Sequence, residues 1–279
     1  MKEHLSPRDI KSYVCHLRAE EKSAATIEKY ARDTRQFFCF AAGRRLDKEL
    51  VIAYKSRLCA QYAPSSVNSM LAAVNSLLAY LGRADLRVKR LRIQRQIFCP
   101  KEKMLDREEY RRLVLAAQAR HDPRLALLLQ TLCSTGIRVG ELPYITAKAA
   151  QSGKAVVTSK GKSRVVLLPK QLCARLRQYC RARGIASGCI FRSRSGRPLN
   201  RSNIWAAMKG LCAAAGVRAE KVFPHNLRHL FARAFYSADK DISRLADILG
   251  HSSVETTRVY IVSSGLEHER QLAKLRLLI

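Results

Sequence analysis

The chain has 279 residues, of which 52 are lysine or arginine and 22 are aspartate or glutamate, giving a formal net charge of +30. Basic residues extend from one end of the chain to the other, which favours a long surface facing a polyanion such as DNA over a short basic arm. No two of the nine cysteines are spaced as C-x-x-C, so zinc-ribbon and thioredoxin-type proteins are excluded.

The same composition predicts the compartment. The N-terminus lacks the apolar core of a signal peptide, and no apolar run approaches the ~18 residues that a membrane span needs. We therefore expect a cytoplasmic, nucleoid-associated protein with no membrane contact, whose cysteines are reduced and mostly buried.

Residues 1–90 are predicted to form a compact all-helical domain. Apolar residues recur at helical spacing in four segments, which open near Pro7, Ser23, Asp47 and Pro64. The polar faces between these stripes can donate hydrogen bonds to phosphates, although simple solvation is an equal alternative. Residues 91–103 are rich in arginine and lysine and are interpreted as a basic linker along DNA, or as a solvated connector.

Residues 104–279 are predicted to form a second, larger domain. Asp106 and Glu109 have the spacing of a capping box, and the helix that begins at Pro123 is almost wholly apolar and hence central. Two β-branched runs within residues 155–168 predict a hairpin that turns at Gly161, with further helices near 170–183 and 200–215. The fold class is therefore mainly α with a small β-hairpin, in two domains.

Chemistry-bearing residues gather late in the chain. His225 and Arg228 are three apart and share one face of a predicted helix, and Gly250 ends a later helix so that His251 follows at its end. Tyr260 comes about two turns further on. An in-line nucleophile, cations around the phosphate oxygens and an acid for the leaving oxygen would together allow phosphodiester cleavage. Arg138, which follows the buried helix, is a further candidate cation.

These segments resemble the boxes of the tyrosine recombinase (phage integrase) family, in particular its short Xer-like and mobile-element members. The boxes are Thr135–Leu142, Ser159–Arg164, His225–His229, Leu249–His251 and Tyr260, in the family's order, and residues 1–82 resemble the family's helical core-binding, SAM-like domain. The resemblance implies that Arg138 and Arg228 bind the scissile phosphate and that Tyr260 attacks it. It also implies that Lys160 is the general acid, that His225 assists proton transfer and that His251 contacts the phosphate.

Several assignments stay open at this stage. Lys162 is an alternative to Lys160, Glu141 either braces Arg138 or is a surface acid, and His229 is either a packing residue or a catalytic one. Tyr236 and Tyr179 are alternative tyrosines.

The implied function is site-specific DNA recombination through a 3′-phosphotyrosyl intermediate, with no metal or other cofactor. Integration, excision and dimer resolution are all compatible with it. A type IB topoisomerase and a non-enzymatic DNA-binding protein are the alternatives, and a metal nuclease is disfavoured because no carboxylate cluster accompanies the boxes. The expected partners are double-stranded recombination sites and three further copies, joined through an amphipathic helix at 265–279; an accessory directionality factor is a further candidate.

Overall fold

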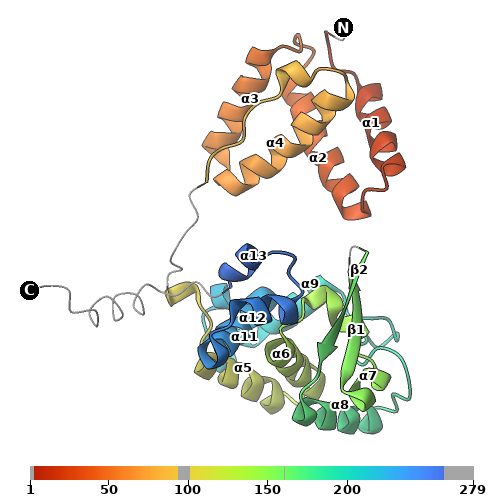
Figure 1. Ribbon diagram of the computed structural model, residues 1–279, viewed down its shortest axis with the longest axis vertical. Helices are drawn as coiled ribbons and strands as arrows, with labels where there is room; N and C mark the ends of the chain where they lie inside the picture. Colours follow the sequence, from red (N-terminus) through yellow and green to blue (C-terminus); the bar gives the residue numbers. More distant parts are fainter. Residues whose placement is uncertain (1–2, 94–100, 160, 261–279) are drawn as a thin grey trace, which may run out of the picture. The chain divides into compact units, whose positions relative to one another are not determined.

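The computed structural model describes residues 3–93, 101–159 and 161–260. By their internal contacts the residues divide into two compact units, Met1–Arg95 and Gln96–Ile279 (Figure 1). Each unit has its own hydrophobic core, so each is described by itself.

The first unit is a bundle of four helices. They are α1 (Pro7–Ala19), α2 (Ala24–Ala41), α3 (Lys48–Gln61) and α4 (Pro64–Tyr80), followed by a short 3₁₀ turn, η1 (Ala84–Leu86). Proline opens α1 and α4, and the side chain of Asp47 accepts a hydrogen bond from Leu50 N at 2.8 Å to cap α3. The interior is formed by aromatic and aliphatic side chains such as Tyr13, Phe37 and Leu71.

The segment that leaves this bundle is held along α4 by two asparagines. Asn75 bonds both the N–H and the carbonyl of Val88, and Asn68 bonds the same two groups of Leu91, at 2.7–3.1 Å. Lys55 adds a bond to the carbonyl of Lys89. Residues 88–91 therefore belong to the first unit, although the predicted basic linker begins at residue 91. Residues 94–100, in the middle of that linker, lie outside the described residues.

The second unit contains the remaining helices and the hairpin. Its elements are η2 (Lys101–Lys103), α5 (Arg107–Ala119), α6 (Pro123–Thr135), η3 (Val139–Tyr144), α7 (Ala147–Ser152), β1 (Lys154–Ser159), β2 (Lys162–Leu167), α8 (Lys170–Ala182), α9 (Arg201–Gly210), α10 (Cys212–Ala215), η4 (Ala219–Lys221), α11 (Pro224–Asp239), α12 (Ile242–Leu249) and α13 (Val254–Arg258). The predicted capping box of α5 is confirmed, because Asp106 and Glu109 each accept from the other's backbone N–H.

Helix α6 is the centre of this unit, as its apolar sequence predicted. It contacts α5, α8 and α11, and Figure 1 shows α11, α12 and α13 grouped on one side of it and the hairpin on the other. β1 and β2 pair antiparallel from Lys154↔Leu167 to Ser159↔Lys162, and Gly161 takes a φ of +74° in the turn. Ala155, Val157 and Val166 face the core. The predicted fold class, mainly α with a small hairpin, is confirmed.

Two smaller findings concern the cysteines and the membrane. Of the eight cysteines in the described ranges, Cys15, Cys39 and Cys59 are exposed and only three are fully buried. The prediction of mostly buried thiols is therefore wrong for the first unit, where these cysteines lie off the apolar stripes of their helices. Within the described residues, no helix is long and apolar enough to cross a membrane.

Candidate active site

Arg138 lies where the central helix gives way to η3, and its position is controlled by a buried carboxylate. Glu141 is 3% exposed and accepts the backbone N–H of Arg138 at 2.8 Å and its guanidinium Nη1 at 3.2 Å. Arg164, on β2, donates two further bonds of 2.8 Å to the two oxygens of Glu141. Glu141 is thus not a surface acid but the link between two arginines.

Arg228 is the largest fully buried side chain of the described residues, with 1% exposure. It extends from the second turn of α11 and donates to the carbonyls of Gly136 and Leu249, the latter at 2.8 Å. Its Nη2 is also 2.8 Å from Nε2 of His251. A buried guanidinium needs hydrogen-bond partners, and among the described residues Nη1 and Nη2 of Arg228 have them whereas its buried Nε has none. These bonds join the end of α6, the first turns of α11 and the end of α12 at one point.

Two glycines make this junction possible. Gly136 and Gly250 cap α6 and α12 in the left-handed conformation, with φ of +63° and +65°. A Cβ on Gly136 would lie 2.4 Å from a ring carbon of Phe231, and a Cβ on Gly250 would lie 2.4 Å from Cδ of Arg164. Both positions therefore need glycine for space as well as for conformation.

Tyr260 lies against three imidazole rings and the buried arginine. Its ring centroid is 4.5 Å from that of His229 and 5.0 Å from those of His225 and His251. The guanidinium carbon of Arg228 is 5.4 Å from the same centroid. Tyr260 is 6% exposed, so the phenol is held within the unit, beside the predicted phosphate-binding arginine.

The pKa values of these histidines are all lowered from the usual 6.5. Burial lowers the pKa of His229 to about 4, helped by His225, and burial together with Arg228 and Arg138 lowers the pKa of His251 to about 4. Partial burial and the same two arginines lower the pKa of His225. At neutral pH the three rings are uncharged, so each has a nitrogen able to accept a proton. Nδ1 of His251 is 2.9 Å from Oγ1 of Thr257, which orients that ring.

A groove of about 880 Å³ opens beside this cluster. Arg138, His225 and Arg228 line it, together with two exposed residues of α9, Arg201 and Trp205. Its other lining residues are Ile137, Val139, Gly140, Glu141, Tyr144, Thr158, Ser202, Phe223 and Pro224. Tyr260 contacts two of the lining residues, His225 and Arg228, without being one of them.

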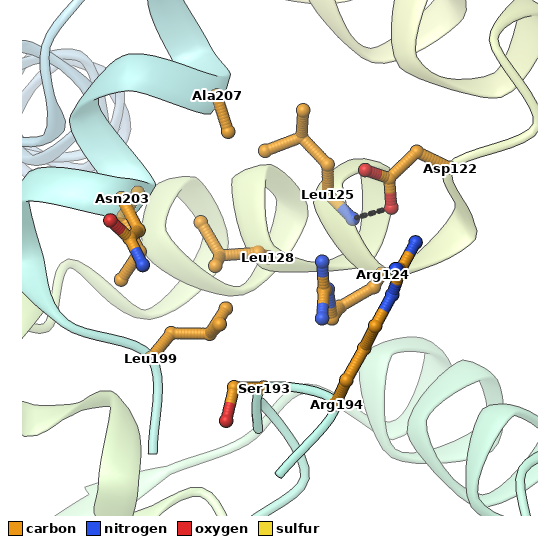
Figure 2. Close-up of a pocket in the computed structure, with 10 residues that line it drawn as sticks. Asp122, Arg124, Leu125, Leu128, Ser193, Arg194, Leu199, Asn203 and Ala207 are labelled. Atoms are coloured by element: carbon orange, nitrogen blue, oxygen red, sulfur yellow. Dashed lines mark hydrogen bonds between the residues drawn. The ribbon is translucent and has the colours of Figure 1, made fainter. Parts of the chain in front are cut away.

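A second, smaller pocket of about 190 Å³ lies between α6 and α9. Figure 2 shows Leu125, Leu128 and Leu199 around its interior and the side chains of Arg124 and Arg194 close together at one end. It is lined by none of the predicted site residues.

The structure brings together five of the six predicted catalytic residues, Arg138, His225, Arg228, His251 and Tyr260, around one junction. Lys160 lies outside the described residues, and of Lys162 only the backbone register is described. The predicted helix at 265–279 also lies outside them. In the described ranges, no group of three or more His, Cys, Asp or Glu side chains is placed to hold a metal ion.

Sequence reasoning missed two residues of this site, Arg164 and Thr257. Arg164 belongs to a β-branched run and ends the Ser159–Arg164 box, where no role is predicted for it, and no pattern singles out Thr257. An arginine with its side chain on the core-facing side of a strand is the signal that would have drawn attention to Arg164, because charged side chains are rarely buried without a partner.

Comparison with known proteins matches both units. The model of the phage integrase family matches residues 103–265, and that of the phage integrase N-terminal SAM-like domain matches residues 10–85. Tyrosine recombinase XerA of Thermococcus kodakarensis is 29% identical over 279 residues, covering 95% of each chain. A crystal structure of XerA recombinase has a TM-score of 0.55 at 27% identity, covering 98% of this chain and 99% of that one.

A lambda integrase tetramer bound to a Holliday junction shares the fold, with a TM-score of 0.72 at 16% identity over 91% of this chain and 76% of that one. The chain therefore belongs to the phage integrase family. It is a tyrosine-type site-specific recombinase, and the topoisomerase and non-enzymatic alternatives are not favoured.

Proposed function

We propose that Tyr260 is the nucleophile and that Arg138 and Arg228 bind the scissile phosphate in the groove. The phenolic oxygen forms a bond to phosphorus, the bond to the 5′ oxygen breaks, and Lys160 supplies the proton to that oxygen. His225, neutral at pH 7, accepts the phenolic proton, and His251, whose Nε2 accepts from Arg228, contacts the phosphate beside that arginine. The product is a 3′-phosphotyrosyl link and a free 5′-hydroxyl. That hydroxyl then attacks the phosphotyrosyl link of a partner strand, so that a new phosphodiester forms and the phenolic oxygen of Tyr260 leaves and regains its proton.

One observation carries this proposal. The Tyr260 ring packs on the guanidinium of Arg228, and Arg228 lines the groove together with Arg138 and His225. A nucleophile, two forked cations and a neutral base thus occupy one small region, as in-line phosphoryl transfer requires. Because Tyr260 is buried and does not line the groove, we further propose that DNA draws the phenol forward before attack.

The groove also fits a nucleic-acid backbone. Arg201 and the half-exposed indole of Trp205 lie on its wall, and Nζ of Lys209 is 5.1 Å from the Trp205 ring. With a net charge of +30, binding is expected to release many counterions, so DNA affinity falls steeply as salt rises.

The test is covalent capture. Randomised duplexes with a nick would be incubated with the protein, denatured, and selected for DNA that stays attached to it; sequencing gives the preferred site. The wild type is expected to form the adduct and Tyr260→Phe to form none while still binding the duplex. Tyr236→Phe, a tyrosine of the same cluster, is the matched control and keeps the adduct. An adduct that persists in Tyr260→Phe would overturn the assignment.

We also propose that the protein works as a tetramer on two recombination sites, joined through residues 265–279. The amphipathic pattern of that segment and the tetrameric lambda integrase complex support this. Deletion of residues 266–279 should abolish synapsis, measured by the joining of two duplexes in a gel, while single-site binding persists. Unchanged synapsis after the deletion would refute the role of the tail, and supercoil relaxation by a lone protomer would favour topoisomerase activity instead.

A further inference from the structure

Arg164 occupies a position that the proposed mechanism does not yet use. It lies on β2, paired with Val157, and its side chain is 17% exposed. Its two bonds to Glu141, both 2.8 Å, are a bidentate arginine–carboxylate pair, whereas the guanidinium of Arg138 makes one bond of 3.2 Å to the same carboxylate. Arg164 is therefore the principal counterion of Glu141.

The pairing of Arg164 with Glu141 determines how many guanidinium donors of Arg138 stay available to a ligand. Glu141 is buried, and burial alone would raise its pKa, but the bonds from Arg164 and from the Arg138 backbone hold that pKa below its usual value. The carboxylate is thus ionised and nearly satisfied. The Arg138 side chain remains 40% exposed, and among the described residues Glu141 is the one partner of its guanidinium. Arg138 is also one of the residues that line the groove.

The stem of Arg164 has a second contact, with the turn that carries His251. The space where Gly250 would have a side chain is filled by Cδ, Nε and Cζ of Arg164, at 2.4–3.0 Å from the Cβ position. His251 is the next residue, and it bonds Arg228. From β2, the side chain of Arg164 therefore contacts both the carboxylate that holds Arg138 and the glycine that precedes His251.

We propose that Arg164 is a positioning residue for strand cleavage, which neutralises Glu141 so that Arg138 stays available to the scissile phosphate. Without Arg164, the buried carboxylate has only Arg138 left as a cationic partner and draws its guanidinium out of the groove. The inference rests on the proposed function of Arg138, and it assigns Arg164 an indirect role: its side chain acts through Glu141 and does not touch DNA.

The test compares rates of adduct formation under single-turnover conditions, on the nicked duplex obtained by covalent capture. Arg164→Met should slow adduct formation about 30-fold with duplex affinity changed less than about threefold, because a misplacement of about 1 Å in a catalytic group can slow a reaction by up to about 100-fold. Arg164→Lys keeps the positive charge but cannot make the bidentate pair with Glu141, so its rate should lie between those of the wild type and Arg164→Met. Arg111→Met is the matched control, because it removes an arginine bonded to Glu108 on the exposed face of α5.

A second substitution separates positioning from packing. If Arg164 acts by neutralising Glu141, then Glu141→Gln in the Arg164→Met background should recover the rate to within about fivefold of wild type, because no unpaired buried charge remains. If Arg164 only supports the fold, the double variant should be as slow as Arg164→Met, and the proposal is overturned. Arg164→Met with the wild-type rate would overturn it as well.

Two further outcomes are informative. Where Arg164→Met alone does not fold, the double variant and Arg164→Lys decide: a slow but folded double variant overturns the proposal. Where the wild type itself forms no Tyr260-dependent adduct, the proposed function fails, which is a different result from a wild-type adduct that is insensitive to Arg164.

Discussion

The imidazole of His229 stacks on the phenol of Tyr260, with ring centroids 4.5 Å apart and an interplanar angle of 27°. His229 comes from the second turn of α11 and Tyr260 from the turn that follows α13, so this contact ties the proposed nucleophile to the helix that carries His225 and Arg228. A stacked aromatic pair contributes about 1 kcal/mol beyond its buried area. The contact is thus strong enough to order the phenol and weak enough to be released when DNA binds.

The first prediction concerns this stack. His229→Ala should raise the rate of single-turnover adduct formation up to about fivefold, because about 1 kcal/mol no longer holds the phenol in the buried position that it must leave before attack. His229→Phe keeps a ring at the same position and should keep a rate close to that of the wild type. Duplex affinity, measured by titration, should stay unchanged in both. Equal rates for wild type and His229→Ala would mean that the stack has no part in placing Tyr260.

The second prediction concerns Arg228. Arg228→Ala should lower the rate of adduct formation by about 100-fold or more, and duplex affinity far less, because the contact tightens as charge builds on the transferring phosphoryl group. The structure adds a stability cost of about 2–3 kcal/mol, since the carbonyls of Gly136 and Leu249 lose their buried donor. Urea unfolding measures that cost separately. Rate and affinity falling by the same factor would make Arg228 an anchor only.

Gly136 provides the third prediction. Gly136→Ala adds a Cβ 2.4 Å from a carbon of Phe231 and also strains the left-handed backbone. We expect a loss of about 3 kcal/mol, of which about 1 kcal/mol is the backbone term and the rest is overpacking. Gly153→Ala is the control, because Gly153 has a φ of +72° and open space around it, so only the backbone term applies. Thermal unfolding compares the two, and equal losses would show that Phe231 moves aside freely.

Much of this architecture follows from local sequence patterns. Apolar periodicity located the helices, Asp47 and Asp106 marked helix starts, and Gly161 marked the hairpin turn, since each depends on neighbours within a few residues. Arg138 was noticed because it directly follows a buried helix. His225 and Arg228 were found because a spacing of three places them on one helical face, which a single sequence reveals.

Other features could not be predicted because they depend on how distant segments pack. The bond between Arg164 and Glu141 joins residues 23 apart through the register of a hairpin against η3. The burial of Tyr260 among three histidines depends on the angle between α11 and α13. Cys15, Cys39 and Cys59 are exposed for a local reason, because they lie off the apolar stripes of their helices. Here the helical spacing predicts burial better than the general tendency of cysteine to be buried.

The final prediction concerns pH. The pKa of His229 is lowered to about 4 in the folded protein, mainly by burial, and returns toward 6.5 when the chain unfolds. Below pH 6.5 the unfolded chain therefore binds a proton that the folded protein refuses, so stability falls as pH drops from 6.5 to 4. The contribution of His229 is about 1.4 kcal/mol per pH unit in that window.

Fluorescence of Trp205, the one tryptophan of the chain, follows unfolding of the second unit in urea. Between pH 6.5 and 5, His229→Phe should lose less stability than the wild type by about 2 kcal/mol, because its ring takes no proton. Above pH 7 the two pH profiles should run parallel, because His229 is neutral there in both the folded and the unfolded chain. A His229→Phe profile as steep as that of the wild type would mean that His229 is protonated within the fold, and its stack on Tyr260 would then be a cationic one.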